Sequence, residues 1–441
     1  MPEFIKGSKR ARRGWAFYDW ANSVYSLVIA TAVFPIYYGS VTTGEENNLV
    51  RFLGTDWENT VIYSYCLSFS FLLVAIMSPI LSGIADYSGS KKRFLQVFCY
   101  IGAAACAGLY FFNGENVGLA LTLSVIASVG FWGSLVFYNA YLPEVAFEDQ
   151  QDATSAMGFS YGYIGATLLL IANLAMILQP ETFGLADSGQ ASRISFLMVA
   201  VWWIGFAQFT FRRLPEPRDG GKITKDVLGN GYRALRSVWR QLGEMADLKR
   251  FLIGFFMLSV GVQTIIYVAS LFGEKELELE STYLIGTIIL IQLLGIVGAQ
   301  FFSYLSSRIG NIRALIASLL VWASMGGVAF ALQADDPIVQ YKFLALGSAV
   351  GLVLGGVQAL ARSTYSKMLP EDATKHTSFF SFFDVTEKVA IILGTFIYGL
   401  LESLTGNMRM SIMALSLFFV FAILALWPMR HRFAAYRVKE R

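Results

Sequence analysis

The sequence predicts an all-α integral membrane protein with twelve transmembrane helices, and three observations lead to this class. First, 55% of the 441 residues are hydrophobic and only 15% are charged, whereas soluble domains carry about 25% charged residues. Second, apolar runs of about 20 residues, the length that crosses a bilayer, recur along the whole chain. Third, lysine and arginine residues gather in alternate loops, as they do in the cytoplasmic loops of membrane proteins.

The expected helices and loops divide the chain into two parts of six helices each. The longest loop separates these parts, and it contains proline, glycine and many basic residues. We therefore expect an N-terminal half at 1–211, a cytoplasmic linker at 212–250, a C-terminal half at 251–430 and a basic cytoplasmic tail at 431–441. The helices are expected at about 14–38, 59–84, 93–112, 116–141, 155–178, 193–211, 251–272, 282–305, 312–333, 339–361, 377–401 and 408–429.

The distribution of basic residues predicts that both termini are cytoplasmic. With the N-terminus inside, the inner segments hold 28 of the 34 lysine and arginine residues, the outer segments hold 5, and Lys388 alone lies within a span. Such an excess marks the cytoplasmic side of a membrane protein. The linker contains a basic stretch at 232–242 with helical spacing, which fits either a solvated linker or a helix on anionic lipid headgroups.

Short motifs recur in the two halves. Leu-Pro-Glu follows the fourth expected helix at 142–144 and the tenth at 369–371, and Thr-Ser opens the fifth at 154–155 and the eleventh at 377–378. Two related six-helix units are a common plan of secondary transporters. The sequence therefore predicts two six-helix pseudo-repeats.

The loop after the second expected helix, SGIADYSGSKKR, resembles the conserved Gly-x-x-x-Asp-Arg-x-Gly-Arg-Arg loop of the major facilitator superfamily. It matches that loop at Asp86, Gly89 and Lys91 and departs from it at Ser82 and Tyr87. The resemblance implies the major facilitator fold and a conformational latch, in which Asp86 accepts hydrogen bonds from a helix N-terminus or pairs with an arginine. A simple tight turn with basic flanks is the other interpretation.

A degenerate copy of the loop, SYLSSRIGNIR, follows the eighth expected helix and adds Arg308 and Gly310 to the candidate latch. A narrower resemblance extends over nearly the whole chain. RGWAFYDWANSVYSLVIATAVFP, YNAYLPEVA, GGVQALARS and SFFDVTEKVAIILG resemble the vacuole-effluxer-like branch of the superfamily, whose eukaryotic members are autophagy-related vacuolar amino-acid effluxers. This resemblance implies a twelve-helix transporter that exports amino acids.

The eleventh expected helix carries three charges near its middle, Asp384, Glu387 and Lys388. Each costs about 2.5–3.5 kcal/mol at the centre of a membrane helix, so we expect them to be paired or to face a cavity. Their spacing places all three on one helix face. Either Glu387 binds a proton or a substrate ammonium with Lys388 as counter-ion, or Asp384 and Lys388 form a pair that only holds helices together.

The first expected helix presents Asp19 and Asn22 on one face. Asp19 is a candidate for a coupling proton or a substrate amine, and the alternative is that it pairs with Arg12 or Arg13 at the interface or caps a loop. The resemblance implies that the first, fourth, seventh and tenth helices line a central cavity. The polar candidates on the latter three helices either bind a zwitterion or form interhelical hydrogen bonds; they are Trp132, Asn139, Gln263, Tyr267 and Gln358. Arg362, near the inner end of the tenth helix, is expected to be an interfacial anchor, and a carboxylate-binding residue is the alternative.

These observations predict a secondary transporter or facilitator that moves a small solute, most simply amino acids in efflux, by alternating access. The alternatives are a transporter of another metabolite or drug and a nutrient receptor that binds its ligand without transporting it. We expect no enzyme activity, because no nucleophile–base pair or metal-ligand cluster stands out. We also expect no cofactor, no metal and no nucleic-acid partner. We expect a monomer in the cytoplasmic (inner) membrane of a prokaryote, with a proton as the candidate coupling ion.

Overall fold

The computed structural model describes residues 4–44, 48–215, 227–370 and 372–431. Within these ranges, twelve helices are long and apolar enough to cross a membrane, and the secondary structure is nearly all helical. The predicted all-α membrane class is therefore confirmed. The expected linker falls partly, and the expected basic tail almost wholly, outside the described residues.

Each expected apolar run forms a spanning helix, and most helices extend a few residues beyond it at one end or both. The first span combines α1 (Lys9–Val24), a π-helix (Tyr25–Ala32) and α2 (Val33–Thr42). The other spans are α3 (Asn59–Ser88), α4 (Lys91–Gly108), α5 (Val117–Asn139), α7 (Gln151–Leu178), α8 (Ser188–Phe211), α10 (Ala246–Lys275), α11 (Ser281–Ile309), α12 (Asn311–Ala331), α13 (Val339–Lys367), α14 (His376–Thr405) and α15 (Met408–Leu426).

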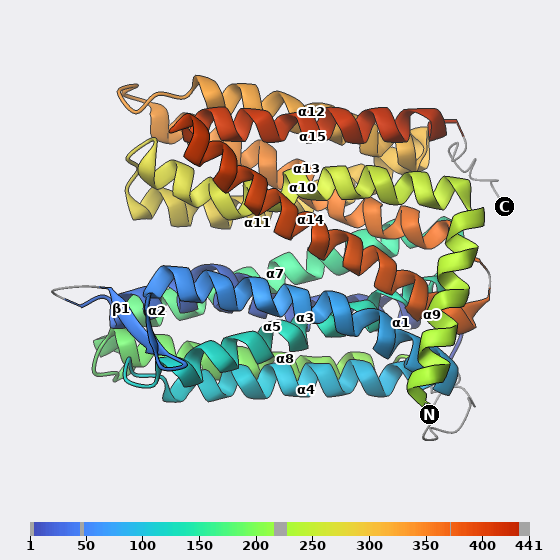
Figure 1. Ribbon diagram of the computed structural model, residues 1–441, viewed down its shortest axis with the longest axis horizontal. Helices are drawn as coiled ribbons and strands as arrows, with labels where there is room; N and C mark the ends of the chain where they lie inside the picture. The colour runs from blue at the N-terminus through green and yellow to red at the C-terminus, as the bar shows by residue number, and fades with distance from the viewer. Residues whose placement is uncertain (1–3, 45–47, 216–226, 371, 432–441) are drawn as a thin grey trace.

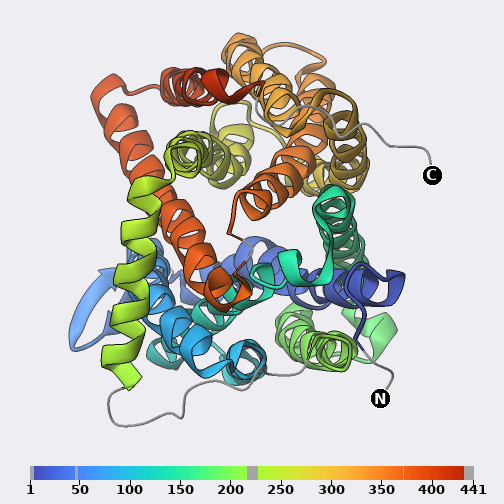
Figure 2. The ribbon, with the colours of Figure 1, turned by 90° about the vertical axis from the view of Figure 1, so that its right-hand side faces the viewer.

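The helices form two bundles that lie one above the other in Figure 1, with α1–α8 in the lower bundle and α10–α15 in the upper one. The bundles meet where α7 packs on α11 and α13, and where α14 packs on α3 and α5. Both chain ends lie at one end of the molecule, which we call the terminal face (Figures 1 and 2). The opposite end carries a β-hairpin and is called the hairpin face.

The hairpin and a one-turn helix were not among the elements expected from the sequence, and an 18-residue helix forms in the linker. Strands β1 (Leu49–Phe52) and β2 (Thr55–Glu58) pair antiparallel in the loop after α2. The one-turn helix α6 (Leu142–Val145) follows α5. In the linker, α9 (Val227–Glu244) runs across the terminal face at a steep angle to the spanning helices and packs on α3 (Figure 1).

The first span is interrupted by π-helical turns at Tyr25–Ala32, which the sequence did not reveal. Each such turn leaves the regular i to i−4 hydrogen-bond ladder, and such bulges occur often at functional sites. The hydroxyl of Thr31 donates to the carbonyl oxygen of Ser26, 2.8 Å away, within this segment. The change of pitch turns Tyr25, Ser26 and Thr31 toward the space between the bundles.

Candidate functional site

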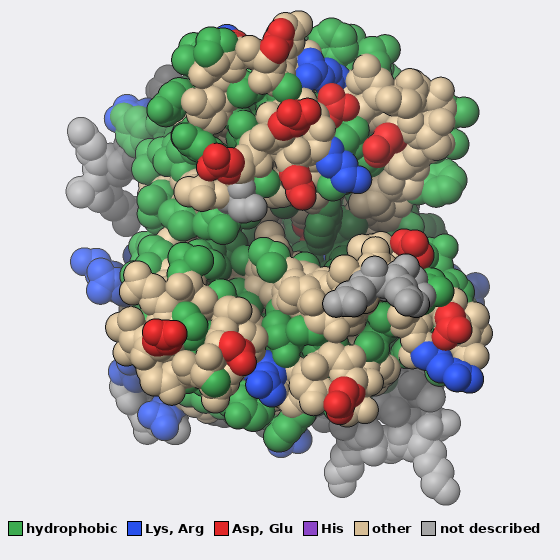
Figure 3. Space-filling view, turned by 90° about the vertical axis from the view of Figure 1, so that its left-hand side faces the viewer, with side chains coloured by type: hydrophobic (Ala, Val, Ile, Leu, Met, Phe, Trp, Pro, Cys, Tyr) green, Lys and Arg blue, Asp and Glu red, His purple; other side chains and the backbone are tan. Residues whose placement is uncertain are grey.

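A cavity of about 300 Å³ lies between the two bundles. Its walls come from the first span, α3, α5 and α7 on one side, and from α10, α11, α13 and α14 on the other. Side chains toward the hairpin face, such as Thr31 and Ser270, and side chains deeper in the molecule, such as Asp19 and Arg362, line the same space. The hairpin face is hollowed between the bundles, with hydrophobic side chains along the hollow (Figure 3).

An ion pair between the bundles forms the deep end of this cavity. Arg362 on α13 donates from Nη1 and from Nη2 to Oδ2 of Asp19 on α1, over 3.2 Å in each case. The side chains are only 4% and 7% exposed. Tyr138 on α5 donates its hydroxyl to the same oxygen over 2.8 Å. Since charges withdrawn from water need several partners to offset desolvation, this carboxylate is well satisfied in the present conformation.

The guanidinium of Arg362 is held on every side. Its Nε donates to Oγ of Ser155 over 3.0 Å, and its Nη2 donates to the carbonyl oxygen of Ser155 over 2.9 Å. Phe159 and Trp15 lie 4.1 and 4.8 Å from the guanidinium carbon, measured to the ring centres. Gly158 leaves room for the pair, because a Cβ there would overlap Oδ2 of Asp19. Arg362 is thus a buried element of the site, and the expected interfacial anchor was wrong.

The three charges of α14 form a second cluster beside the cavity. Nζ of Lys388 lies 3.1 Å from Oδ1 of Asp384 and 2.8 Å from Oε2 of Glu387. The Lys388 side chain is completely buried, and its Nζ lies 3.5 Å from the ring centre of Trp132 on α5. Ser78 on α3 donates to Oδ2 of Asp384 over 3.2 Å. The ion pairs lie within α14, whereas the cation–π contact with Trp132 and the hydrogen bond from Ser78 hold α14 against the other bundle.

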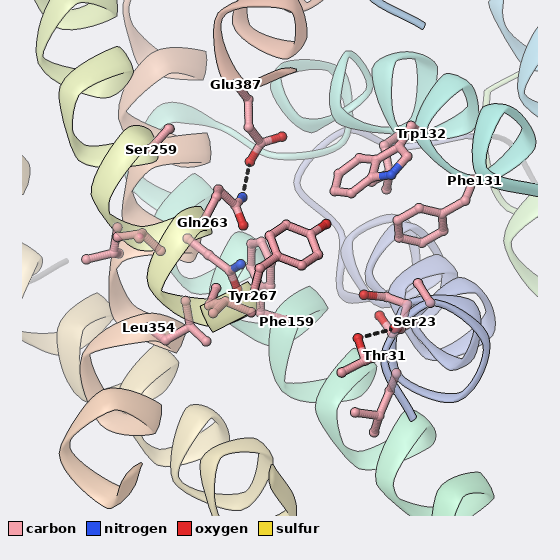
Figure 4. A pocket seen from close by; sticks show the side chains of 18 of the residues that line it. Ser23, Thr31, Phe131, Trp132, Phe159, Ser259, Gln263, Tyr267, Leu354 and Glu387 are labelled. Carbon is pink, nitrogen blue, oxygen red and sulfur yellow. Dashed lines mark hydrogen bonds between the residues drawn. The ribbon is translucent and has the colours of Figure 1, made fainter. Parts of the chain in front are cut away.

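Glu387 is the member of this cluster that faces the cavity. Its side chain is 21% exposed, and its Oε1 accepts a hydrogen bond of 2.8 Å from Nε2 of Gln263 on α10. In Figure 4, Glu387 and Gln263 point toward one another, with Tyr267 and Trp132 around the same space. A carboxylate that lines a cavity of mostly apolar walls is a strong attractor for a cationic group.

Eight of the ten residues predicted to bind substrate or a coupling ion line the cavity; they are Asp19, Asn22, Trp132, Asn139, Gln263, Tyr267, Gln358 and Glu387. Asp384 and Lys388 lie behind Glu387. Gln358 accepts a hydrogen bond of 2.7 Å from Tyr163 of the other bundle. Asn22 is 1% exposed, and its Nδ2 has no hydrogen-bond partner among the described residues.

The candidate latch lies at the terminal face. Oδ2 of Asp86, at the end of α3, accepts hydrogen bonds of 2.7 Å from the backbone N–H and from the hydroxyl of Ser378, and Oδ1 accepts one of 3.2 Å from the N–H of Thr377. These donors belong to the first turn of α14, so the carboxylate caps a helix of the other bundle. Gly89 ends α3 with a φ of 64°, the left-handed conformation that favours glycine.

Lys91 does not reach the other bundle directly. It forms an ion pair with Glu144 on α6, and its Nζ lies 4.4 Å from the ring centre of Tyr141. Glu144 in turn lies 3.9 Å from Nδ1 of His376, at the start of α14. The contact between bundles here therefore runs through Glu144.

The second loop copy is arranged differently from the first. Asp152, at the start of α7, accepts from the hydroxyl of Ser306, from Nδ2 of Asn311 and from Nζ of Lys367, each over 2.8 Å. The acid thus comes from the opposite bundle, while the loop supplies two of the donors and Lys367, at the end of α13, supplies the third. Arg308 is exposed and lies over the ring of Tyr304 on its own helix, 5.1 Å from its centre. Gly310 has a φ of 90° between α11 and α12.

These contacts lie at the deep end of the cavity and at the terminal face. In the described part of the chain, they join the bundles through ion pairs and hydrogen bonds that close the cavity toward the terminal face. The cavity consequently opens toward the hairpin face. No group of three or more His, Cys, Asp or Glu side chains comes together as metal ligands would within the described ranges.

Comparison with known families identifies this architecture. The family described as "Vacuole effluxer Atg22 like" matches residues 7–435. The chain belongs to this family. An MFS-type transporter of Bacillus subtilis, YxiO, is 30% identical over 427 residues, which cover 96% of this chain and 95% of the relative. Autophagy-related protein 22 of Kluyveromyces lactis is 25% identical, covering 94% of this chain and 92% of the relative.

Solved structures give the same fold. The major facilitator superfamily transporter FucP, in its outward conformation, superposes with a TM-score of 0.67 at 15% identity, covering 96% of this chain and 98% of that one. The proton:xylose symporter XylE superposes with a TM-score of 0.65 at 13% identity, covering 96% and 94%. The family and these neighbours are transporters and not enzymes. The Atg22-like chain is therefore an integral membrane transporter of the major facilitator type.

Several residues of the site were not found from the sequence. Tyr138, Ser155 and Gly158 surround the Asp19–Arg362 pair, and Asp152 and Lys367 hold the terminal face closed. Asp152 lies in an acidic loop that contrasts with the basic loops around it, which was a usable signal. Tyr138 and Gly158 gave no such signal, because aromatic and small residues are common in every membrane helix.

Proposed function

We propose that this Atg22-like transporter exports neutral amino acids by alternating access through the cavity between its bundles. The observation that supports this most directly is the position of Glu387. The cations of the site do not fully neutralise its carboxylate. Arg362 neutralises Asp19, and Lys388 is shared by Asp384 and Glu387. With all groups ionised, the three carboxylates and two cations leave one negative charge, on the side of the cavity.

The cavity offers groups for each part of an amino acid. An ammonium group fits beside Glu387 and Gln263, where the carboxylate supplies ionic attraction and the aromatic rings of Trp132 and Tyr267 line the same space. The unpartnered Nδ2 of Asn22 is a donor for a carboxylate on the opposite wall. Apolar side chains line the rest, including Phe71, Phe131, Phe159 and Phe383. A volume of about 300 Å³ suits a small ligand.

Competition at Glu387 supplies a simple coupling mechanism. A proton and a substrate ammonium both neutralise this carboxylate, so each excludes the other. Exchange of one for the other across the membrane would drive export against a concentration gradient. The contacts of Lys388 with Trp132 and of Asp384 with Ser78 cross between bundles, so occupancy of Glu387 acts on the groups that hold the bundles together.

We further propose that both termini are cytoplasmic, that a monomer is sufficient, and that the membrane is the cytoplasmic membrane of a prokaryote. The excess of basic residues at the terminal face supports the orientation. A cavity lined entirely by the two halves of one chain supports the monomer. The Bacillus subtilis relative supports the setting. In this orientation the described conformation faces outward.

Counterflow in proteoliposomes tests the proposed function. Liposomes preloaded with an unlabelled neutral amino acid should accumulate the labelled amino acid transiently above its external concentration. An acid-inside gradient should change the uptake rate, whereas glucose or an organic anion as preload should give no counterflow. Saturable binding without counterflow would identify a receptor instead. Counterflow with another solute class alone would keep the transporter and overturn the substrate.

A further inference from the structure

Helix α9 presents a surface that the transport cycle proposed above does not use. Its packed side carries Val238 and Leu242, which are 0% and 7% exposed and belong to a core shared with the C-terminal bundle. Its other side carries Tyr232 and Trp239, which are 63% and 67% exposed. Two arginines, Arg236 and Arg240, lie on the same outer side and are also exposed.

The position of α9 places this surface at the border of the membrane. The helix crosses the ends of the spanning helices at a steep angle (Figures 1 and 2). It packs on α3, and Trp239 lies 5.6 Å from Phe382 of α14, measured between ring centres. Since α3 and α14 are membrane spans, their terminal-face ends lie where lipid headgroups begin.

The residue types on the outer side match that position. Tryptophan and tyrosine favour the boundary between headgroups and acyl chains, because their rings are apolar and carry one polar atom. Arginine on the polar side of an in-plane amphipathic helix attracts anionic headgroups. Within the described part of the chain, neither Arg236 nor Arg240 belongs to any of the ion pairs, so both guanidinium groups are available to an anion.

We propose that the outer surface of α9, formed by Tyr232, Arg236, Trp239 and Arg240, binds the headgroups of anionic membrane lipids. Each arginine near a membrane surface contributes roughly a fivefold preference for an anionic lipid over a zwitterionic one. The pair therefore selects an anionic headgroup, while the two aromatic rings fix the depth of the helix. Because α9 packs on both α3 and α14, the bound lipid lies beside the two helices that Asp86 joins.

Quenching of tryptophan fluorescence by brominated lipids tests this surface in the full-length protein. The protein is reconstituted with brominated phosphatidylglycerol or with brominated phosphatidylcholine, and the Trp239→Phe variant is subtracted to isolate the signal of Trp239. We expect that signal to be quenched by both lipids and several-fold more strongly by the anionic one at limiting brominated lipid. Phenylalanine at position 239 keeps an aromatic ring beside Phe382.

Charge variants identify the groups that select the lipid. Arg236→Gln combined with Arg240→Gln should remove the preference for phosphatidylglycerol and leave quenching by phosphatidylcholine. The matched control is Arg51→Gln with Lys275→Gln, which removes two exposed basic residues at the hairpin face and should keep the preference. Equal quenching by both lipids in the wild type would overturn the proposal. Quenching of Trp239 by aqueous iodide but by neither lipid would show a solvated helix and overturn it as well.

Discussion

Both terminal nitrogens of Arg362 donate to a single oxygen of Asp19, although the two residues are 343 positions apart in the chain. This pair joins α13 to α1 and forms the deep end of the cavity. Closure of the cavity on that side therefore depends on a contact between the bundles that must break when the opposite conformation forms. The hydrogen bonds of Asp86 with Ser378 and the contact of Lys388 with Trp132 also cross between the bundles.

Arg362→Ala should destabilise the described conformation, because it leaves the carboxylate of Asp19 buried without a cation. Breaking a buried ion pair from one side costs about 3–5 kcal/mol. A cysteine at Ala299, which is fully buried between the bundles, reports the opening. In a background without Cys66, Cys99 and Cys106, maleimide labelling of Ala299→Cys should rise strongly.

A charge exchange separates loss of the ion pair from general damage at this site. Asp19→Arg with Arg362→Asp retains one cation and one anion at the deep end of the cavity, so it should recover part of the protection of Ala299→Cys. If Arg362→Ala leaves the labelling rate unchanged, the pair does not hold the bundles together.

Gly158→Ala should act on the same pair without altering any charge. The added methyl group would overlap Oδ2 of Asp19 and approach Nη2 of Arg362. Gly205→Ala is the matched control, since nothing lies within 4 Å of a Cβ at that helical position. Alanine is favoured over glycine in a helix by about 1 kcal/mol, so the control should be neutral or stabilising. Lower thermal stability and slower counterflow are expected for Gly158→Ala only, and equal behaviour of the two variants would contradict this account.

The spans and the charge cluster of α14 were predictable from the sequence, because both follow from local patterns. Twenty apolar residues specify a membrane helix wherever they occur, and residues three or four apart share a helix face. The partner of Asp19 was not predictable in the same way. Arg12 and Arg13 are near it in sequence, whereas Arg362 is brought to it only by the packing of two bundles. The π-helix of the first span had no local signal either, since its sequence is an ordinary apolar run.

Asp86→Ala should slow transport with little change in substrate affinity. Asp86 caps α14 through three hydrogen bonds but does not line the cavity. Loss of an N-cap side chain costs about 0.5–2 kcal/mol, and this cost falls on the conformation closed at the terminal face. The counterflow rate of Asp86→Ala should therefore fall, while its apparent Kd for substrate, measured by thermal shift, should stay close to that of the wild type. A large loss of affinity instead would place Asp86 in the binding site and contradict the latch.

Lys388→Ala should reduce stability more than the double change Asp384→Ala with Lys388→Ala. The single change leaves the carboxylate of Asp384 buried, with Ser78 as its remaining hydrogen-bond donor, and should cost about 3–5 kcal/mol. The double change removes the uncompensated charge as well. Thermal unfolding of the purified variants measures the difference. Residues that interact give non-additive losses, so simple additivity would argue against a coupled pair.

Glu387→Gln should weaken amino-acid binding and remove the response of transport to a pH gradient. Glutamine keeps the shape of the side chain and can still accept from Nε2 of Gln263, but it carries no charge for an ammonium group or a proton. Loss of a charged hydrogen-bond partner costs about 1.5–3 kcal/mol, or roughly 10- to 100-fold in Kd. Glu402→Gln, on the same helix and outside the cavity lining, is the matched control and should retain both properties. If transport by Glu387→Gln still responds to the pH gradient, another group couples transport to protons. If the Kd for the amino acid is unchanged in this variant, the ammonium group does not bind at Glu387.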